Sequence, residues 1–229
     1  MARPASAPVR RELPDTQRRR DAARPWYRYA ARLLPRDARA RWVDFGCGQG
    51  EFLALGAACG LAGIGADLAR ANAAAAARAG RPAFVADLAR PLPLRSACLD
   101  GASLLEVVEH IPDAEALARE LARVIRPGGW LLVTTPNVAH WTYRWRALRG
   151  RPPKQEGRHF RFFTASTGVA LFAAAGFEPS GRASFGKQAL LTSALRAAGR
   201  PRGEKVHYAV PRALEPLLAL HLVWRFVRA

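Results

Sequence analysis

Three side chains that could do chemistry lie close together in the stretch LEVVEH, namely Glu106, Glu109 and His110. Carboxylates and imidazoles bind divalent cations and transfer protons near neutral pH. If the chain turns helical here, the spacing i, i+3, i+4 places all three on one face. The stretch therefore indicates a metal site, an acid/base pair, or a polar patch where a buried strand surfaces.

Short apolar runs alternate with helical stretches on both sides of LEVVEH. The runs are 42–45, 62–66, 83–86, 101–105 and 130–134, and the helical candidates between them are 50–59, 69–79 and 113–125. This alternation is typical of βαβ units. We expect an α/β fold with a doubly wound, mostly parallel sheet, in which LEVVEH follows the fourth strand.

The rest of the chain divides by composition. Residues 1–24 predict a disordered basic arm, because they are rich in Arg and lack apolar periodicity. A helix at 26–34 then opens a domain expected over 25–198. Residues 137–163, rich in Trp, Arg and His, predict an inserted lid within it. A helix at 165–175 and a strand near 177–184 are expected next, and the region 199–229 predicts an irregular tail with a final amphipathic helix at 213–227.

A glycine-rich turn follows the first strand in DFGCGQG, and acids end the next two strands. Glycines let the backbone approach a ligand closely, at the N-terminus of the following helix. Asp67 ends the second strand, where a carboxylate can accept hydrogen bonds from ribose hydroxyls. Asp87 ends the third strand and could accept from the amino group of an adenine. Glycine-rich turns alone would also fit a dinucleotide site, but the spacing here is GxGxG rather than GxGxxG.

From Arg41 to about Phe177 the chain resembles the class I S-adenosylmethionine-dependent methyltransferases. The matching motifs, in order and at family spacing, are DFGCGQG, GADLA, VADLARPLPL, LLEVVEHIPD and IRPGGWLLVTTPN. The resemblance implies a Rossmann-like, seven-stranded sheet and S-adenosyl-L-methionine as cofactor. It implies cofactor contacts from Asp44, Gly46, Cys47, Gly48, Gly50, Asp67, Leu68, Asp87, Leu88 and Leu105.

The implied roles differ along this set. The glycines would contact the aminoacyl end of the cofactor, Asp67 the ribose, Asp87 with Leu88 the adenine, and Leu105 would wall the sulfonium. Two structural alternatives stay open: glycines that serve turn geometry alone, and Asp87 as a helix N-cap. Cys47 is expected to fill space rather than act as a nucleophile, because no histidine lies beside it in sequence.

Methyl transfer is an in-line displacement, so positioning and removal of the acceptor proton are the main tasks of the protein. The ExxEH pattern, with His159 before an F-T helix start, is similar to two methyltransferase branches: quinone-biosynthesis O-methyltransferases and small-RNA 3′-terminal 2′-O-methyltransferases. That similarity implies Mg²⁺ or another divalent cation at Glu106, Glu109, His110 and His159. Such an ion would lower the pKa of an acceptor hydroxyl.

Two readings without a metal remain for these residues. In one, Glu109 and His110 act as a metal-free catalytic acid/base pair. In the other, Glu106 hydrogen-bonds the glycine loop, Glu109 caps the next helix and His110 packs. We expect O-methylation of a small or lipid-like acceptor. The alternatives are an RNA 2′-O-methyltransferase and a cofactor-binding partner protein without turnover.

The formal charge of +18, from 36 Lys+Arg and 18 Asp+Glu in 229 residues, fits an anionic partner or coding bias. Aromatic and Arg residues mix in the lid, which suits a membrane interface, RNA stacking, or a plain substrate lid. Nucleic acid is the less favoured partner.

Location and assembly are only partly constrained. The cysteines Cys47, Cys59 and Cys98 have no zinc spacing and fit a reducing compartment. With no signal-peptide pattern and no run of roughly 20 apolar residues, we expect a cytoplasmic protein with peripheral contact to an anionic inner membrane face. The oligomeric state stays open.

Overall fold

The computed structural model describes residues 24–36, 40–152, 159–187 and 207–229. The expected basic arm, apart from Arg24, and the tail before residue 207 therefore lie outside the described residues. The strands are β1 (Trp42–Phe45), β2 (Gly63–Asp67), β3 (Ala83–Val85), β4 (Leu99–Leu105), β5 (Ile125–Pro136), β6 (Phe177–Arg182), β7 (Phe185–Lys187), β8 (His207–Ala209) and β9 (His221–Arg228). The helices are α2 (Pro25–Ala31), α3 (Glu51–Ala58), α4 (Arg70–Arg78), α5 (Ala114–Val124), α6 (Trp141–Leu148), α7 (Ala165–Ala173) and α9 (Glu215–Leu218), with 3-10 turns η1 (Val108–His110) and η2 (Arg212–Leu214).

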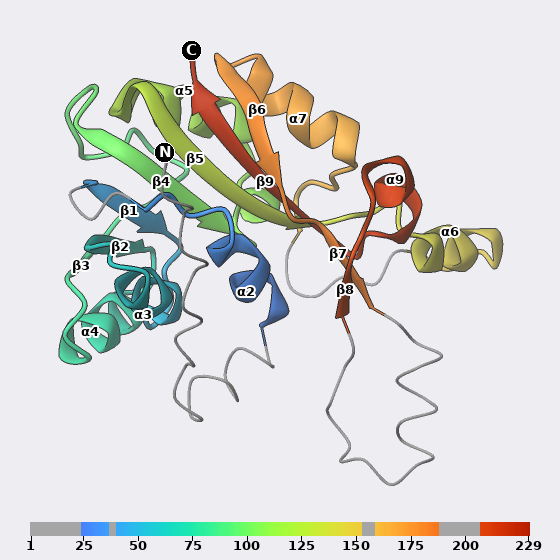
Figure 1. Cartoon of the computed structure of the whole chain (residues 1–229), viewed down its shortest axis with the longest axis horizontal. Helices are drawn as coiled ribbons and strands as arrows, with labels where there is room; N and C mark the ends of the chain where they lie inside the picture. Colours follow the sequence, from blue (N-terminus) through green and yellow to red (C-terminus); the bar gives the residue numbers. More distant parts are fainter. Residues whose placement is uncertain (1–23, 37–39, 153–158, 188–206) are drawn as a thin grey trace, which may run out of the picture.

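All of these strands join one twisted sheet, in the order β3-β2-β1-β4-β5-β9-β7-β8, with β6 also paired to β9 (Figure 1). The first five strands in this order run parallel, and β9 is antiparallel to β5. The expected α/β fold with a mostly parallel sheet is thus confirmed. The described sheet has nine strands rather than the seven expected, because the antiparallel pair β7 and β8 extends its edge.

The expected C-terminal helix at 213–227 is wrong. A single turn, α9, occupies Glu215–Leu218, and the rest of the segment is strand β9. Every residue of β9 from His221 to Val227 pairs with β5, and β6 pairs along its other edge. Two ladders of backbone hydrogen bonds therefore outweigh the helical spacing of the polar residues His221 and Arg225.

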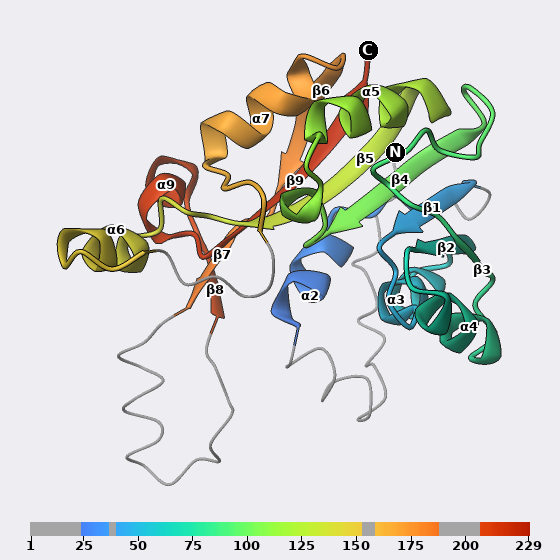
Figure 2. The same ribbon diagram turned by 180° about the vertical axis from the view of Figure 1, so that it is seen from behind.

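Helices cover both faces of the sheet, α2 and α3 on one and α5 and α7 on the other (Figures 1 and 2). The alternation of side chains along a strand sends Trp130 and Leu132 to the α2 side, and Leu131 and Val133 to the α5 side. Each face thereby gains its own apolar core, with the central strands buried between them. The parallel strands are held rigidly, so their carboxyl ends form a fixed edge for a ligand site.

The lid begins after β5 and contains α6, which projects from the end of the sheet beside α9 in both views (Figures 1 and 2). None of the residues of α6 is buried. Its N-cap, His140, is buried, and its Nδ1 lies 2.7 Å from Thr142 Oγ1. Burial, with a smaller effect of His221, lowers the pKa of His140 to about 4, which fits a neutral capping residue.

Candidate functional site

The glycine loop between β1 and α3 has a backbone that side chains rarely adopt. Gly46, Gly48 and Gly50 have φ of 75°, 55° and 82°. The loop is tied to β2, because Gly46 N donates to Ala66 O at 2.7 Å. A Cβ placed on Gly46 would lie 2.4 Å from Val107 Cγ2, so only glycine fits beside the LEVVEH turn. The glycines therefore allow the sharp turn and also leave the backbone of the loop open to close approach by a ligand.

Asp67, at the end of β2, fixes this loop. One carboxylate oxygen accepts from Gly48 N at 2.9 Å, and the other accepts from Ala69 N at 2.8 Å and Asn72 Nδ2 at 3.1 Å. A carboxylate has about four acceptor positions, so after these three hydrogen bonds Asp67 keeps about one position that could accept from a ribose hydroxyl. The position of Asp67 between the glycine loop and β2 is compatible with the expected hydrogen bond to the ribose of the cofactor.

Asp87 lies beyond β3, about half-exposed, and organises a local turn. Its carboxylate accepts from Ala89 N at 2.9 Å, and its second oxygen lies 3.3 Å from Arg90 Nε. The expected alternative of a helix N-cap is replaced by a cap on a non-helical turn. Beside it, Leu88 is buried while Leu68 is 68% exposed. Leu68 thus offers an exposed apolar surface directly after Asp67, the acid that ends β2.

Asp44 and Cys47 lie beneath the loop and are buried. Ser103 Oγ donates to Asp44 Oδ1 at 2.6 Å, and burial raises the pKa of Asp44 to about 7. The Cys47 thiol packs against Gly65, where an added Cβ would meet Sγ at 2.5 Å. Burial raises the pKa of this thiol to about 12, so Cys47 is a neutral space-filling group and supports the loop from below.

Glu106 departs from the face expected of LEVVEH. The strand β4 ends at Leu105, and Glu106 has φ 59°, which reverses the chain before η1 begins at Val108. Its carboxylate accepts from Thr134 Oγ1 at 2.8 Å, and its other oxygen lies 3.0 Å from His221 Nδ1. The helical spacing argument fails here, because the residue precedes the helical turn. Glu106 therefore lies outside the group formed by the other three expected ligands.

Glu109, His110 and His159 do come together, as the sequence predicts. One potential ligand atom from each lies within 4.8 Å of the others. The lid reaches this point because the backbone N–H groups of Phe160 and Arg161 both donate to the carbonyl of Glu109. The rings of His110 and His159 are 4.8 Å apart, edge to face. Contact with the lid thus completes a group of two imidazoles and one carboxylate.

Glu109 is 1% exposed, and its Oε2 accepts from Thr135 Oγ1 at 3.2 Å. Its Oε1 is buried without a hydrogen-bond partner among the described residues. Burial, followed by repulsion from Glu106, raises the pKa of Glu109. It does not cap α5; Asp113 accepts from Ala116 N instead. An unpaired buried carboxylate oxygen is costly, and a cation or a donated proton would satisfy it.

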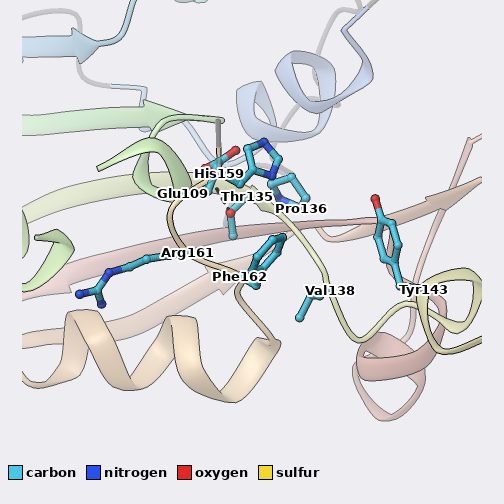
Figure 3. Close-up of a pocket in the computed structure, with 8 residues that line it drawn as sticks. All are labelled: Glu109, Thr135, Pro136, Val138, Tyr143, His159, Arg161 and Phe162. Atoms are coloured by element: carbon cyan, nitrogen blue, oxygen red, sulfur yellow. Dashed lines mark hydrogen bonds between the residues drawn. The ribbon is translucent and has the colours of Figure 1, made fainter. Parts of the chain in front are cut away.

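A pocket opens beside this group (Figure 3). Glu109, Thr135 and His159 lie close together in this view, and Tyr143, on α6, stands well apart from them. The lining residues are Glu109, Thr135, Pro136, Val138, Tyr143, His159, Arg161 and Phe162. The exposed wall of this small pocket is mostly apolar, with the polar groups of Glu109, Thr135, His159 and Arg161 at its lining.

Several residues that define the site were missed from sequence. Arg24 is one arginine among many in a basic segment of the sequence, yet it lies against the glycine loop. His221, expected on a helix, reaches Glu106 from β9. Thr135 follows a buried run and holds Glu109. The acid directly after GCGQG, Glu51, was the one available signal for the Arg24 contact.

The fold and site together define the class of protein: a parallel α/β sheet with a glycine loop after β1 and acids after β2 and β3. The family of methyltransferase domains matches residues 16–180. The chain belongs to this family, and the resemblance found in the five motifs is confirmed.

Curated relatives match over part of their length. A ubiquinone biosynthesis O-methyltransferase of Chromobacterium violaceum is 32% identical over 104 residues, covering 42% of this chain and 44% of the relative. A probable S-adenosylmethionine-dependent methyltransferase of Mycolicibacterium smegmatis is 33% identical over 148 residues, covering 64% and 55%. The chain thus spans about half the length of the curated relatives that it matches.

Solved structures share the fold over nearly the whole chain. A putative methyltransferase of Haloferax volcanii, solved with the Trm112 activator, has a TM-score of 0.66 at 19% identity and covers 93% of this chain and 94% of its own. A magnesium protoporphyrin IX methyltransferase of Synechocystis with bound SAH has a TM-score of 0.62 at 16% identity, covering 96% and 90%. At these identities the likeness concerns the fold.

Proposed function

We propose that the chain is an S-adenosylmethionine-dependent methyltransferase that methylates a hydroxyl of a small or lipid-like acceptor. The carrying observation is the unpaired, buried Oε1 of Glu109, which lies with His110 and His159 next to an apolar pocket. A polar group of this composition suits activation of a hydroxyl. The ubiquinone relatives, which are O-methyltransferases by name, favour the same acceptor class.

The cofactor side would be formed by residues whose geometry fits S-adenosylmethionine. The glycine loop offers close backbone access, Asp67 retains about one free acceptor position, and Leu68 offers an exposed apolar surface. When bound, the cofactor supplies an electrophilic methyl group on a sulfonium. The protein itself would orient the sulfonium toward the end of β4, where Leu105 is buried beside the loop.

The cofactor assignment is tested by calorimetry with S-adenosylhomocysteine. Asp67→Ala removes the hydrogen bond from Gly48 N of the loop, the two from Ala69 N and Asn72 Nδ2, and the ribose partner, so we expect binding to be lost. Glu178→Gln, on the exposed surface of β6, is the matched control and should bind like the wild type. Unchanged affinity in Asp67→Ala would exclude this site for the cofactor.

For the acceptor side, we propose a divalent cation held by Glu109, His110 and His159. It would lower the pKa of the acceptor hydroxyl. With Glu106 turned toward His221, two imidazoles and one carboxylate form a softer donor set than the all-oxygen sets that Mg²⁺ prefers. Mn²⁺ and Zn²⁺ are therefore the first ions to test, followed by Mg²⁺.

Metal binding is measured directly by titrating Mn²⁺ under electron paramagnetic resonance. Wild type and Glu178→Gln should bind one ion, and Glu109→Gln and His159→Ala should lose most of the affinity. If none of these proteins binds Mn²⁺, Zn²⁺ or Mg²⁺, the metal proposal fails. Methylation of phenolic acceptors that then depends on His110 would instead support the metal-free pair of His110 and Glu109.

Exposed aromatic and basic side chains on α6 of the lid would let the protein bind a membrane surface that holds a lipid-like acceptor. Trp141, Trp145 and Leu148 are 44%, 50% and 80% exposed, and their spacing places them on one side of α6. Arginines surround this side, at positions 144, 146, 149 and 151. Aromatic and basic side chains of this kind bind the headgroup level of anionic bilayers. None of the helices in the described part of the chain has the length and apolar character needed to cross a membrane.

Peripheral membrane contact is tested by co-sedimentation with phosphatidylglycerol vesicles across a salt series. The double variant Trp145→Ser, Leu148→Ser should remain in the supernatant, whereas Ile64→Thr, at an exposed apolar position on β2, should pellet like the wild type. Equal pelleting of all three proteins would exclude α6 as the contact. Binding to RNA in a gel shift, without vesicle binding, would favour the RNA alternative.

A further inference from the structure

Residues 159–163, the part of the lid that carries His159, lie against the turn that carries the other two candidate ligands. The backbone N–H groups of Phe160 and Arg161 both donate to the carbonyl oxygen of Glu109, at 2.9 and 3.2 Å. Two hydrogen bonds to one carbonyl therefore place the start of this segment, and His159 with it, beside Glu109.

The two ends of this segment are held in different ways. Phe163 is 5% exposed in the apolar core on the α5 side, and its carbonyl accepts from Val138 N at 2.9 Å. Phe160 and Phe162, which lie nearer to His159, are 58% and 43% exposed. A segment with few buried apolar contacts opens at a low cost in free energy. The end that carries His159 therefore depends on polar contacts.

Arg161 supplies the charged contacts at this end. Its Nε donates to Pro112 O at 3.1 Å, and its Nη1 donates to Glu115 Oε1 at 2.5 Å. Both partners follow shortly after His110, where the chain passes from η1 into α5. The start of α5 is itself fixed by the N-cap Asp113. Arg161 therefore joins the lid to the same stretch of chain that carries the other two candidate ligands.

The orientation of Arg161 excludes a simpler role as an anion-binding residue of the pocket. Although Arg161 belongs to the pocket lining, its guanidinium extends away from Glu109, Thr135 and His159 (Figure 3). Its Nε and Nη1 are both engaged at the turn before α5 and at Glu115. Arg161 is thus an anchor of the lid.

We propose that Arg161 is a positioning residue that holds His159 against Glu109 and His110, and so sets the affinity of this group for a divalent cation. The inference rests on the proposed function, since it needs the cation site of that proposal. The side chains of Arg161 and Glu115 are 33% and 49% exposed, and an ion pair of this kind contributes little to overall stability. Loss of the pair should therefore change the site far more than the fold.

The first experiment titrates Mn²⁺ under electron paramagnetic resonance. Arg161→Ala should bind Mn²⁺ roughly 10-fold more weakly than the wild type, the loss expected for hydrogen bonds of a charged group. Glu115→Gln leaves the contact with Pro112, so it should weaken binding only about 2- to 5-fold. Arg161→Lys should recover part of the affinity. Arg119→Ala, at an exposed position of α5, is the matched control and should bind like the wild type.

Two further measurements distinguish positioning from a general loss of structure. At saturating Mn²⁺, spin-echo modulation from imidazole nitrogen should report two histidine ligands in the wild type and one in Arg161→Ala, with an unchanged thermal midpoint. In the protein without metal, the amide of Phe160 should exchange its hydrogen roughly 10-fold faster in Arg161→Ala, because the segment opens more readily. Nuclear magnetic resonance measures this exchange.

The outcomes separate the inference from the proposed function. If the wild type binds no divalent ion, the proposed cation site fails and the effect of Arg161 on affinity fails with it. The amide exchange of Phe160 then still decides whether Arg161 anchors the lid. If the wild type and Arg161→Ala bind Mn²⁺ equally well, only the inference is overturned. Weaker binding that still involves two imidazoles would also overturn it, because His159 would then have kept its place.

Discussion

Asp44 is a carboxyl group without solvent contact at the base of the glycine loop. It is 2% exposed, and burial raises its pKa to about 7 despite the hydrogen bond from Ser103. In an unfolded chain an aspartate has a pKa near 3.9. The folded protein therefore favours the protonated form, and the stabilisation is complete below about pH 4 and is lost as the pH rises toward about 7.

We expect Asp44→Asn to remove this dependence. Between about pH 4 and 7 the wild-type free energy of unfolding should fall by an additional ~1.4 kcal/mol per pH unit relative to the variant. Urea denaturation of both proteins at pH 4 to 8 measures the difference. Ser103→Ala, which removes the hydrogen bond that favours the charged carboxylate, should extend the decline to higher pH. Parallel curves for wild type and Asp44→Asn would contradict the assignment.

Glu106 stores backbone strain at the end of β4. Its φ of 59° lies in the left-handed region, where residues other than glycine cost about 1 kcal/mol or more. Its backbone N–H donates to Thr134 O at 3.0 Å, which holds it there. The position is thus set by the adjacent strand β5 and by the carboxylate contacts with Thr134 and His221.

Two substitutions of Glu106 separate the energetic cost of the left-handed backbone from the contribution of the carboxylate contacts. Glu106→Ala and Glu106→Gly both remove the carboxylate, but only glycine adopts the left-handed backbone freely. We expect the glycine variant to be more stable than the alanine variant by about 0.5–1 kcal/mol, contrary to the usual order of these residues. Urea unfolding at pH 7 checks the order, and a more stable alanine variant would show that the turn relaxes.

Among the elements, β9 shows where sequence patterns fail. Both of its faces are buried, with Leu222, Trp224 and Phe226 on one side and Val223 on the other. A strand covered on both faces loses the strict alternation of apolar and polar residues, so its period is ambiguous. The polar residues of this segment happen to fit a helical stripe. The enrichment in β-branched and aromatic residues was the more reliable signal.

The contact of α7 with β9 provides a test of this strand. A Cβ on Gly168 would lie 2.3 Å from Trp224 Cη2. Gly168→Ala should therefore destabilise the protein by roughly 1–3 kcal/mol, although alanine favours helices. Trp224→Phe should recover part of this loss in the double variant, measured as a coupling energy by urea denaturation. A stabilised Gly168→Ala variant would contradict the packing of α7 on β9.

At the scale of the whole molecule, the five parallel strands and the strand β6 were predicted from sequence, whereas β9 and the antiparallel pairing of the edge were not. The parallel half is built from local βαβ units, whose signals lie within one stretch of sequence. The pairs of β9 with β5 and β6 join residues about 40 to 100 positions apart, so no local pattern specifies them. The site divides similarly: Asp67, Asp87 and the glycines were predicted from their strands. The positions of the Glu106 and Arg24 side chains depend on long-range contacts, so local sequence patterns did not predict them.

Because one sheet passes between both apolar cores, we expect the described domain to unfold as a unit. Trp42 and Trp130 lie in the core on the α2 side, and Trp224 lies in the core on the α5 side. Thermal unfolding followed by tryptophan fluorescence and by far-ultraviolet circular dichroism should give midpoints that coincide. An earlier fluorescence transition would show that one core opens independently of the sheet.

The contact between Gly46 and Val107 limits how this protein can change its acceptor. Val107 lies between the two carboxylates of LEVVEH, and it also fills the space over the first glycine of the cofactor loop. A larger side chain at 107 would press on the loop, so new acceptor preferences obtained there should cost cofactor affinity. Libraries at Tyr143 and Phe162, which line the pocket from the lid, avoid that linkage. Under the proposed function, the lid is therefore where acceptor preference would change without a loss of cofactor affinity.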